Sequence, residues 1–254
     1  MRSRLDNLVV ERGLVPSREQ AQALILAGRV LVNEQKVDKA GAQVAGNAAI
    51  RILGDALPFV SRGGLKLARA LQHWHIDVHG KTCMDIGAST GGFTDCLLQS
   101  GAAKVIAVDT GHGQMDARLR IDPRLRLLEK TNARYLTPSQ LWLDPVDTEP
   151  ISLVVMDVSF ISATLVLPAV AQCARSSTPD HGFDVVVLIK PQFEAGREQV
   201  GKGGIVRDPQ VQQIAVSRVR GTVEELGGTN VEVIESPILG AEGNREFLLH
   251  ARFA

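Results

Sequence analysis

The sequence has few cysteines, few aromatic residues and no long apolar run. Its three cysteines, Cys83, Cys96 and Cys173, form no CxxC motif and no pairing pattern, which argues against a zinc site and a disulfide framework. No stretch approaches the roughly 18 uninterrupted apolar residues of a membrane-spanning helix, and the charged start Met1-Arg2-Ser3-Arg4 is unlike a secretion signal. We therefore expect a cytoplasmic protein with neither a metal nor a membrane partner.

The length and composition are those of a folded protein with more than one part. A chain of 254 residues exceeds the roughly 100 to 200 of a single domain, so one long domain or a large and a small one are expected. Hydrophobic residues make up 44% and charged residues 22%, which allows a sizeable core and argues against disorder.

The chain has no net charge, with 28 Lys and Arg against 28 Asp and Glu. Taken alone, this balance argues against a nucleic-acid partner. However, residues 1–72 carry 11 basic against 6 acidic residues, and residues 73–254 carry 17 against 22, giving +5 and −5. Such an asymmetry indicates a module that binds a polyanion, joined to an acidic domain.

Residues 1–53 have the pattern of a small α+β domain. Apolar spacing over Leu5–Val10 predicts a short helix, and Ser17 with Gln20 forms a capping box for a second helix that ends before Gly28. Short strands are expected at Val30–Val32, Lys36–Val37 and Ile50–Leu53.

Most basic side chains of this region lie off the apolar stripes and are candidates for contacts with phosphates, although a solvated helix face is the simpler alternative. The candidates are Arg2, Arg4, Arg18, Arg29, Lys36 and Lys39. The segment resembles the small RNA-binding domain named after ribosomal protein S-four. The resemblance is carried by Arg4-Leu5-Asp6, Gly13-Leu14, Ser17-Arg18, Ala21, Leu24-Ile25, Gly28 and Val30-x-Val32-Asn33.

Residues 54–61 read as a linker, and residues 62–254 as a large domain in which apolar strands alternate with helices. The expected strands are Lys81–Ile86, Lys104–Asp109, Leu125–Glu129, Ile151–Asp157, Phe183–Ile189, Val231–Ile234 and Phe247–Phe253. The expected helices are Leu65–Trp74, Phe93–Gln99, Ala163–Arg175 and Val211–Leu226. This alternation predicts a Rossmann-like α/β sheet, doubly wound, with ligands at the C-terminal ends of its strands.

The first strand of this domain runs into a glycine-rich loop. Glycines let the backbone approach a ligand closely, and the next strand ends in Asp109, where ribose hydroxyls are usually held. The spacing differs from GxGxxG, so a dinucleotide cofactor is the disfavoured alternative. A carboxylate before the loop suits S-adenosylmethionine, which carries an ammonium group and no pyrophosphate. The cofactor-binding candidates are Asp85, Gly87, Ser89, Gly91, Gly92, Phe93 and Asp109.

Two later strands end in charged residues, Asp157 and Lys190. A lysine that closes an apolar strand is costly to bury unless it is paired or functional, and Asp157 is its natural partner. A purely structural ion pair is the alternative.

The type of methyl acceptor can be narrowed by what the sequence lacks. There is no Asp/Asn-Pro-Pro-aromatic motif for amine methylation, and no cysteine is placed as the nucleophile for carbon methylation. A sugar hydroxyl remains, which must be oriented and relieved of its proton. Lys190 could do either; Lys66 could supply a second cation, and Asp157 and Glu246 could hold the ammonium groups.

Six segments together resemble the TlyA (haemolysin A) family of ribosomal RNA ribose methyltransferases, whose catalytic domain is FtsJ-like. They are Ser61-Arg62-Gly63-Gly64-Leu65-Lys66-Leu67, Asp85–Thr94, Asp157-Val158-Ser159-Phe160-Ile161-Ser162, Lys190-Pro191-Gln192-Phe193-Glu194, Gly203–Asp208 and Gly243-Asn244-Arg245-Glu246-Phe247-Leu248. The resemblance implies a catalytic tetrad of Lys66, Asp157, Lys190 and Glu246, with S-adenosylmethionine as donor. It also implies 2′-O-methylation of cytidines in small- and large-subunit ribosomal RNA.

The resemblance adds two residues to the candidates, and the linker of this chain differs from that of the family. It places Asn132 at an adenine-contacting position, where a plain turn residue is the alternative, and Arg62 among the RNA-binding candidates. The linker has Leu57-Pro58-Phe59-Val60 where the family often has Arg-x-Trp-Val, so a role of the linker in cofactor binding is not expected to carry over. Two other functions stay open: a non-catalytic RNA-binding or assembly factor, and a membrane-active haemolysin.

Overall fold

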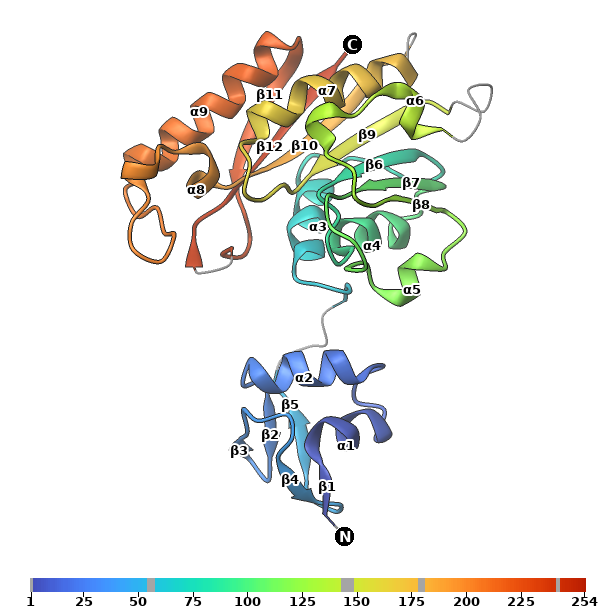
Figure 1. Ribbon diagram of the computed structural model, residues 1–254, viewed down its shortest axis with the longest axis vertical. Helices are drawn as coiled ribbons and strands as arrows, with labels where there is room; N and C mark the ends of the chain where they lie inside the picture. The colour runs from blue at the N-terminus through green and yellow to red at the C-terminus, as the bar shows by residue number, and fades with distance from the viewer. Residues whose placement is uncertain (1, 54–57, 143–148, 178–180, 241–242) are drawn as a thin grey trace. The chain divides into compact units, whose positions relative to one another are not determined.

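The computed structural model describes residues 2–53, 58–142, 149–177, 181–240 and 243–254. The chain forms two compact units, Met1–Pro58 and Phe59–Ala254, and each is described by itself (Figure 1). The second unit begins three residues earlier than the expected position 62. The reason is a contact of the expected linker with this unit, because the Val60 N–H donates to Asp95 Oδ2 at 2.7 Å.

The N-terminal unit is a small α+β domain, as expected. Its elements are β1 (Arg2–Arg4), α1 (Leu5–Glu11), α2 (Arg18–Leu26), β2 (Val30–Val32), β3 (Gln35–Lys36), β4 (Gln43–Ala45) and β5 (Ile50–Ile52). Strands β3, β2 and β5 form an antiparallel sheet, and β1 pairs with β4. The predicted cap of α2 is confirmed, because Ser17 Oγ accepts from the Gln20 N–H at 3.2 Å. Leu5, Val9 and Ile25 are fully buried between the helices and the strands.

The second unit is a doubly wound α/β domain, and the seven predicted strands are confirmed. Its helices are α3 (Gly63–His73), α4 (Gly92–Gln99), α5 (Ala117–Arg120), η1 (Ala133–Tyr135), α6 (Pro138–Leu141), α7 (Ala163–Ser177), α8 (Pro191–Glu194), η2 (Arg197–Gln199) and α9 (Pro209–Glu225). Its strands are β6 (Thr82–Ile86), β7 (Lys104–Val108), β8 (Leu125–Leu128), β9 (Ile151–Met156), β10 (Phe183–Ile189), β11 (Gly228–Glu235) and β12 (Phe247–Phe253).

The sheet order is β11-β12-β10-β9-β6-β7-β8, and helices cover both of its faces (Figure 1). Successive residues of a strand point to opposite faces, so Val154 and Met156 of β9 pack with α7 and α9, whereas Leu153 and Val155 pack with α3 and α4. This burial on both faces explains why the central strands read as continuous apolar runs rather than alternating ones.

One strand orientation was not predicted. β12 runs antiparallel to β10 and β11, whereas β10, β9, β6, β7 and β8 are parallel neighbours. Phe247, at the start of β12, is therefore paired with Ile189, at the end of β10. This register brings the residue before β12 to the sheet edge at which the parallel strands end, and that edge carries the candidate site.

Candidate active site

Two adjoining cavities lie at the C-terminal edge of the parallel strands. They measure about 390 and 370 Å³, and both are lined by Gly87, Ser89, Asp157 and Ser159. The first continues past Lys66 and Lys190, and the second past Asp109 and Asn132. Of the cofactor-loop candidates, Gly87, Ser89, Gly92 and Phe93 line the first cavity. Because the two cavities share these four lining residues, they adjoin each other at the glycine loop.

The glycine loop bends sharply because its backbone packs on the neighbouring strand end. Gly87 has φ +86°, and a Cβ there would lie 2.6 Å from the carbonyl oxygen of Asp157, so a side chain does not fit. The Asp157 N–H donates to the Ile86 carbonyl at 2.8 Å, which joins β9 to the start of the loop. The loop and Asp157 therefore form one fixed corner between the two cavities.

Asp85 and Gly91 line neither cavity, in contrast to the other cofactor-binding candidates. Asp85 is fully buried beneath the loop and accepts a hydrogen bond from Thr94 Oγ1 at 2.6 Å, while its Oδ1 has no hydrogen-bond partner. Burial raises the pKa of Asp85 to about 7. Gly91 has φ +96° as the N-cap of α4. The geometry fits both residues to shaping the loop, not to touching a ligand.

Asp109 and Asn132 lie together in the second cavity, as a ribose- and adenine-binding pair requires. Asp109 accepts from the Ser89 N–H at 2.8 Å and from the Gly111 N–H at 2.6 Å, so its carboxylate is fixed against the loop. Each carboxylate oxygen keeps a further lone pair for a hydroxyl donor. Asn132 also caps η1, because its side-chain oxygen accepts from the Arg134 N–H at 3.1 Å. The structural role expected as the alternative is therefore present.

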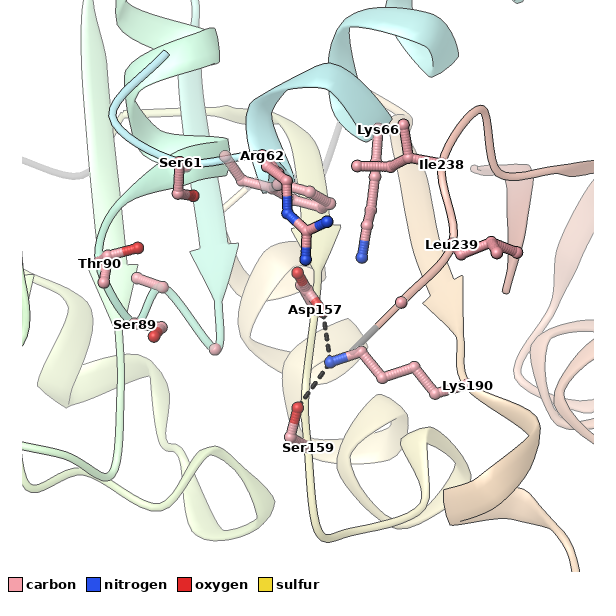
Figure 2. Close-up of a pocket in the computed structure, with 16 residues that line it drawn as sticks. Ser61, Arg62, Lys66, Ser89, Thr90, Asp157, Ser159, Lys190, Ile238 and Leu239 are labelled. Atoms are coloured by element: carbon pink, nitrogen blue, oxygen red, sulfur yellow. Dashed lines mark hydrogen bonds and ion pairs between the residues drawn. The ribbon is translucent and has the colours of Figure 1, made fainter. Parts of the chain in front are cut away.

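Asp157 and Lys190 form the expected ion pair, with Lys190 Nζ 2.6 Å from Asp157 Oδ1 (Figure 2). Lys190 also donates a hydrogen bond to Ser159 Oγ at 2.6 Å. The Lys190 side chain is 11% exposed and that of Asp157 22%, so a ligand in the cavity can reach both. Ser159 was missed from the sequence, although its place two residues after Asp157 at a strand end was the available indication.

A second pair lies on the opposite side of the same cavity. Lys66 Nζ, on α3, lies 2.5 Å from Glu246 Oε2, just before β12. Lys66 points into the cavity (Figure 2), whereas Glu246 lies behind its wall, where a Cβ on Gly240 would come within 2.1 Å of Glu246 Oε1. The structure therefore brings the four tetrad candidates together, three of them at the cavity surface.

An aromatic pair was also missed, and one of its members, Phe160, lines the second cavity. Phe160 is 93% exposed with φ +64°, and its ring centroid lies 5.3 Å from that of Phe193. A non-glycine residue that combines positive φ with an exposed aromatic ring is unusual, which makes Phe160 a candidate for contact with a ligand. Sequence spacing gave no indication of this backbone conformation.

The RNA-binding candidates have different surroundings. Arg62 lines the first cavity, and Lys36 is exposed. Arg4 and Arg18 both donate to Asp6, which is fully buried, and the hydrogen bond from Arg4 holds the pKa of Asp6 well below its usual range. These two arginines therefore stabilise the fold of the N-terminal unit, while about half of each side chain stays exposed. Arg29 donates to the Leu53 carbonyl at 2.8 Å.

Other chemistries find little support in the described parts of the chain. Burial raises the pKa of Cys83 and of Cys96 to about 12, so neither thiol is a ready nucleophile. Within these residues, no three His, Cys, Asp or Glu side chains are grouped as a metal would require. Among the described helices, none is both long and apolar enough to cross a membrane.

Comparisons with known proteins agree with this geometry. Residues 59–253 match the FtsJ-like methyltransferase family, and residues 3–50 match the S4 domain. The chain is 45% identical over 252 residues to the 16S/23S rRNA (cytidine-2′-O)-methyltransferase TlyA of Mycobacterium tuberculosis, which covers 99% of this chain and 90% of that protein. It is 40% identical to Hemolysin A of Brachyspira hyodysenteriae, over 97% of this chain and 98% of that protein.

A solved structure from Streptococcus thermophilus, named as a candidate hemolysin, superposes with a TM-score of 0.76 at 40% identity. The match covers 100% of this chain and 89% of the other. The family matches and these relatives span both units of the chain and confirm the resemblance found in the sequence. The chain belongs to the TlyA family of FtsJ-like methyltransferases and carries an S4 domain.

Proposed function

We propose that this protein methylates the 2′-hydroxyl of cytidine ribose in ribosomal RNA, with S-adenosylmethionine as the methyl donor. The observation that carries the proposal is the meeting of the Lys66–Glu246 and Lys190–Asp157 pairs beside the glycine loop. A ribose hydroxyl is a weak nucleophile and needs a positioned proton acceptor, which such a cluster can provide. The name of the Mycobacterium tuberculosis relative supports ribosomal RNA and cytidine as the substrate class. We expect the protein in the cytoplasm, with its ribosomal substrate.

The polar residues that line the two adjoining cavities fit the groups of S-adenosylmethionine. The second cavity offers Asp109 for ribose hydroxyls and Asn132 for an adenine edge. The first is lined by Ser89 and Thr90, whose polar groups would face the amino-acid end. Gly87 and Asp157, which line both cavities, would hold the part of the cofactor between its nucleoside and amino-acid ends. When bound, the cofactor supplies an electrophilic methyl group.

The four tetrad residues have different roles in the transfer of the methyl group to the hydroxyl. Asp157 and Ser159 hold Lys190 Nζ at a fixed point of the cavity, and in its amine form Lys190 accepts the hydroxyl proton as the oxygen attacks. Glu246 fixes Lys66 on the opposite wall, where the ammonium group stabilises negative charge that develops on the oxygen. The burial of the Lys66–Glu246 pair strengthens this interaction because little water competes.

The RNA is held by two surfaces of different character. The S4 domain offers exposed cations such as Lys36 for phosphates, and in the catalytic domain Arg62 adds a positive charge at the first cavity. Phe160 offers an exposed aromatic face on which the base of the target nucleotide can stack once it leaves its helix.

The direct test is incubation with labelled S-adenosylmethionine and ribosomal subunits that lack the modification, followed by mapping of methylated nucleotides. We expect label on cytidine 2′-oxygens. Label on a base would show that the acceptor assignment is wrong. RNA binding without label would favour the assembly-factor alternative, and leakage of liposomes exposed to the purified protein would favour the haemolysin.

A further inference from the structure

The segments that carry Asp157 and Lys190 are joined a second time, outside the cavity, by Glu194. Glu194 ends α8, four residues after Lys190, and is 3% exposed. Its Oε2 accepts from Ser162 Oγ at 2.5 Å, and its Oε1 accepts from the Ala163 N–H at 2.8 Å. Ser162 and Ala163 follow β9 at the start of α7, so one carboxylate connects the chain after β10 to the chain after β9.

The loop between Asp157 and Ser162 is therefore held at both ends. Its first residue is bonded to β6 through the Ile86 carbonyl, and its last residue is bonded to Glu194. Between these points lie Ser159, which accepts the hydrogen bond from Lys190, and Phe160 with its positive φ. A positive φ at a phenylalanine costs free energy and persists only where the surrounding structure imposes it. The second attachment supplies that constraint.

Glu194 Oε1 caps the first turn of α7 at the Ala163 N–H, so helix capping accounts for part of this contact, and the hydrogen bond between Ser162 Oγ and Oε2 is additional to it. Ser162 Oγ already accepts from the Thr164 N–H at 3.2 Å, which is a local cap of the helix. Glu194 is itself fixed from a third element, because Arg218 on α9 donates to its main-chain carbonyl. Glu194 therefore ties the catalytic loop to a rigid part of the fold.

We propose that Glu194 is a positioning residue that holds Asp157 and Ser159 against Lys190 for methyl transfer. The role rests on the function proposed above. The hydrogen bonds of Glu194 predict that glutamine is tolerated at this position. The glutamine oxygen still accepts from the Ala163 N–H, and the glutamine amide group donates to Ser162 Oγ. The Ser162 hydroxyl hydrogen then turns to Thr164 Oγ1, 2.7 Å away. Burial raises the pKa of Glu194, which agrees with a neutral side chain being accepted there.

The kinetic test compares Glu194→Ala, Glu194→Gln and Ser177→Ala in the full chain, on ribosomal subunits that lack the modification. Ser177 is the matched control because it makes a buried hydrogen bond with Trp142 at the other end of α7. We expect Glu194→Ala to lower kcat about tenfold to a hundredfold through misplacement of the site, with the KM values for RNA and cofactor little changed. Glu194→Gln restores kcat, and Ser177→Ala loses stability but keeps kcat. A wild-type kcat in Glu194→Ala, or an equal loss in Ser177→Ala, overturns the proposal.

A crystal structure of Glu194→Ala tests the same role without activity. The 2.6 Å contact between Lys190 Nζ and Asp157 Oδ1 should open beyond the roughly 4 Å limit of an ion pair. An unchanged contact overturns the proposal. If the wild-type protein transfers no methyl group to ribosomal RNA, the proposed function fails, and this structural comparison still decides whether Glu194 positions the pair.

Discussion

Lys66 and Glu246 lie 180 residues apart in the chain, and their side chains meet in a buried ion pair with 2.5 Å between Nζ and Oε2. Lys66 comes from α3, which precedes the first strand of the sheet, and Glu246 comes from the residue before the last strand. The pair therefore joins the beginning and the end of the catalytic domain across the site, and it links the stability of the domain to its activity.

Removal of one partner should be costly, because it leaves a buried charge without its counter-ion. We expect Glu246→Ala to lower the free energy of unfolding by about 3 to 5 kcal/mol, and Lys66→Ala/Glu246→Ala to lose less than the sum of the single changes. Urea unfolding measures both. The adjacent Arg245→Ala, which breaks an exposed pair with Glu235, should lower the free energy of unfolding far less, because solvent screens that pair. Equal losses at the two positions would contradict the structural role of the buried pair.

The role of Lys190 as proton acceptor is separable from its role as a hydrogen-bond donor. Lys190→Ala removes both, and we expect kcat to fall by a factor of about 10² to 10⁴, while affinity for S-adenosylmethionine stays near that of the wild type. Lys190→Arg keeps a donor that holds its proton at all accessible pH values, so it should be as inactive as alanine if Lys190 is the base.

The rate of single-turnover methylation, together with cofactor affinity from calorimetry, distinguishes Lys190 as a proton acceptor from Lys190 as a hydrogen-bond donor. Substantial activity in Lys190→Arg would mean that the residue orients the hydroxyl and does not accept its proton. Wild-type activity in Lys190→Ala would remove Lys190 from the mechanism altogether.

The catalytic domain was largely predictable because its strands are buried on both faces. Such strands read as apolar runs, and a charged residue at the end of a run, as at Asp157 and Lys190, stands out. The orientation of β12 was not predicted, because an apolar run reads the same in either direction. The connection over residues 236–246 was the indication, since it is short for a crossover between parallel strands.

The least predictable features depend on tertiary packing. Asp85 has the sequence position of a ligand-binding acid, yet α4 places Thr94 over it and removes it from the cavity surface. In the N-terminal unit, β1 and β4 are three residues long and carry no apolar alternation, so neither could be seen before their pairing was known. The contacts of Glu194 are likewise with residues 31 and 32 positions earlier, which the sequence does not place beside it.

Asp85 should make stability depend on pH in a defined direction. Its pKa is raised from 3.8 to about 7 in the folded protein, so the folded state holds a proton that the unfolded state releases. Its contribution to stability is therefore present below pH 4 and is lost as pH rises to 7, by up to about 4 kcal/mol for a shift of about three units. Asp85→Asn, which keeps an acceptor for Thr94, should remove this loss. Denaturant unfolding at pH 5 and pH 8 measures the free energy of unfolding of both proteins. The stability of Asp85→Asn relative to the wild type should grow with pH, and a constant difference would count against the raised pKa of Asp85.

The two kinds of basic residue in the S4 domain should respond differently to substitution. Lys36 is exposed, so Lys36→Ala should weaken RNA binding about equally for all sequences and reduce the slope of log affinity against log salt by about one, without a change in stability. Arg4→Ala should weaken binding and also lower stability, because Asp6 is buried and loses one of its partners.

Arg51, whose charge is already paired with Glu34 on the same unit, is the matched control, and Arg51→Ala should change the slope of log affinity against log salt least. Filter binding over a salt series with thermal unfolding of each variant measures both effects. Identical slopes for Lys36→Ala and the wild type would show that this face of the domain does not contact phosphates.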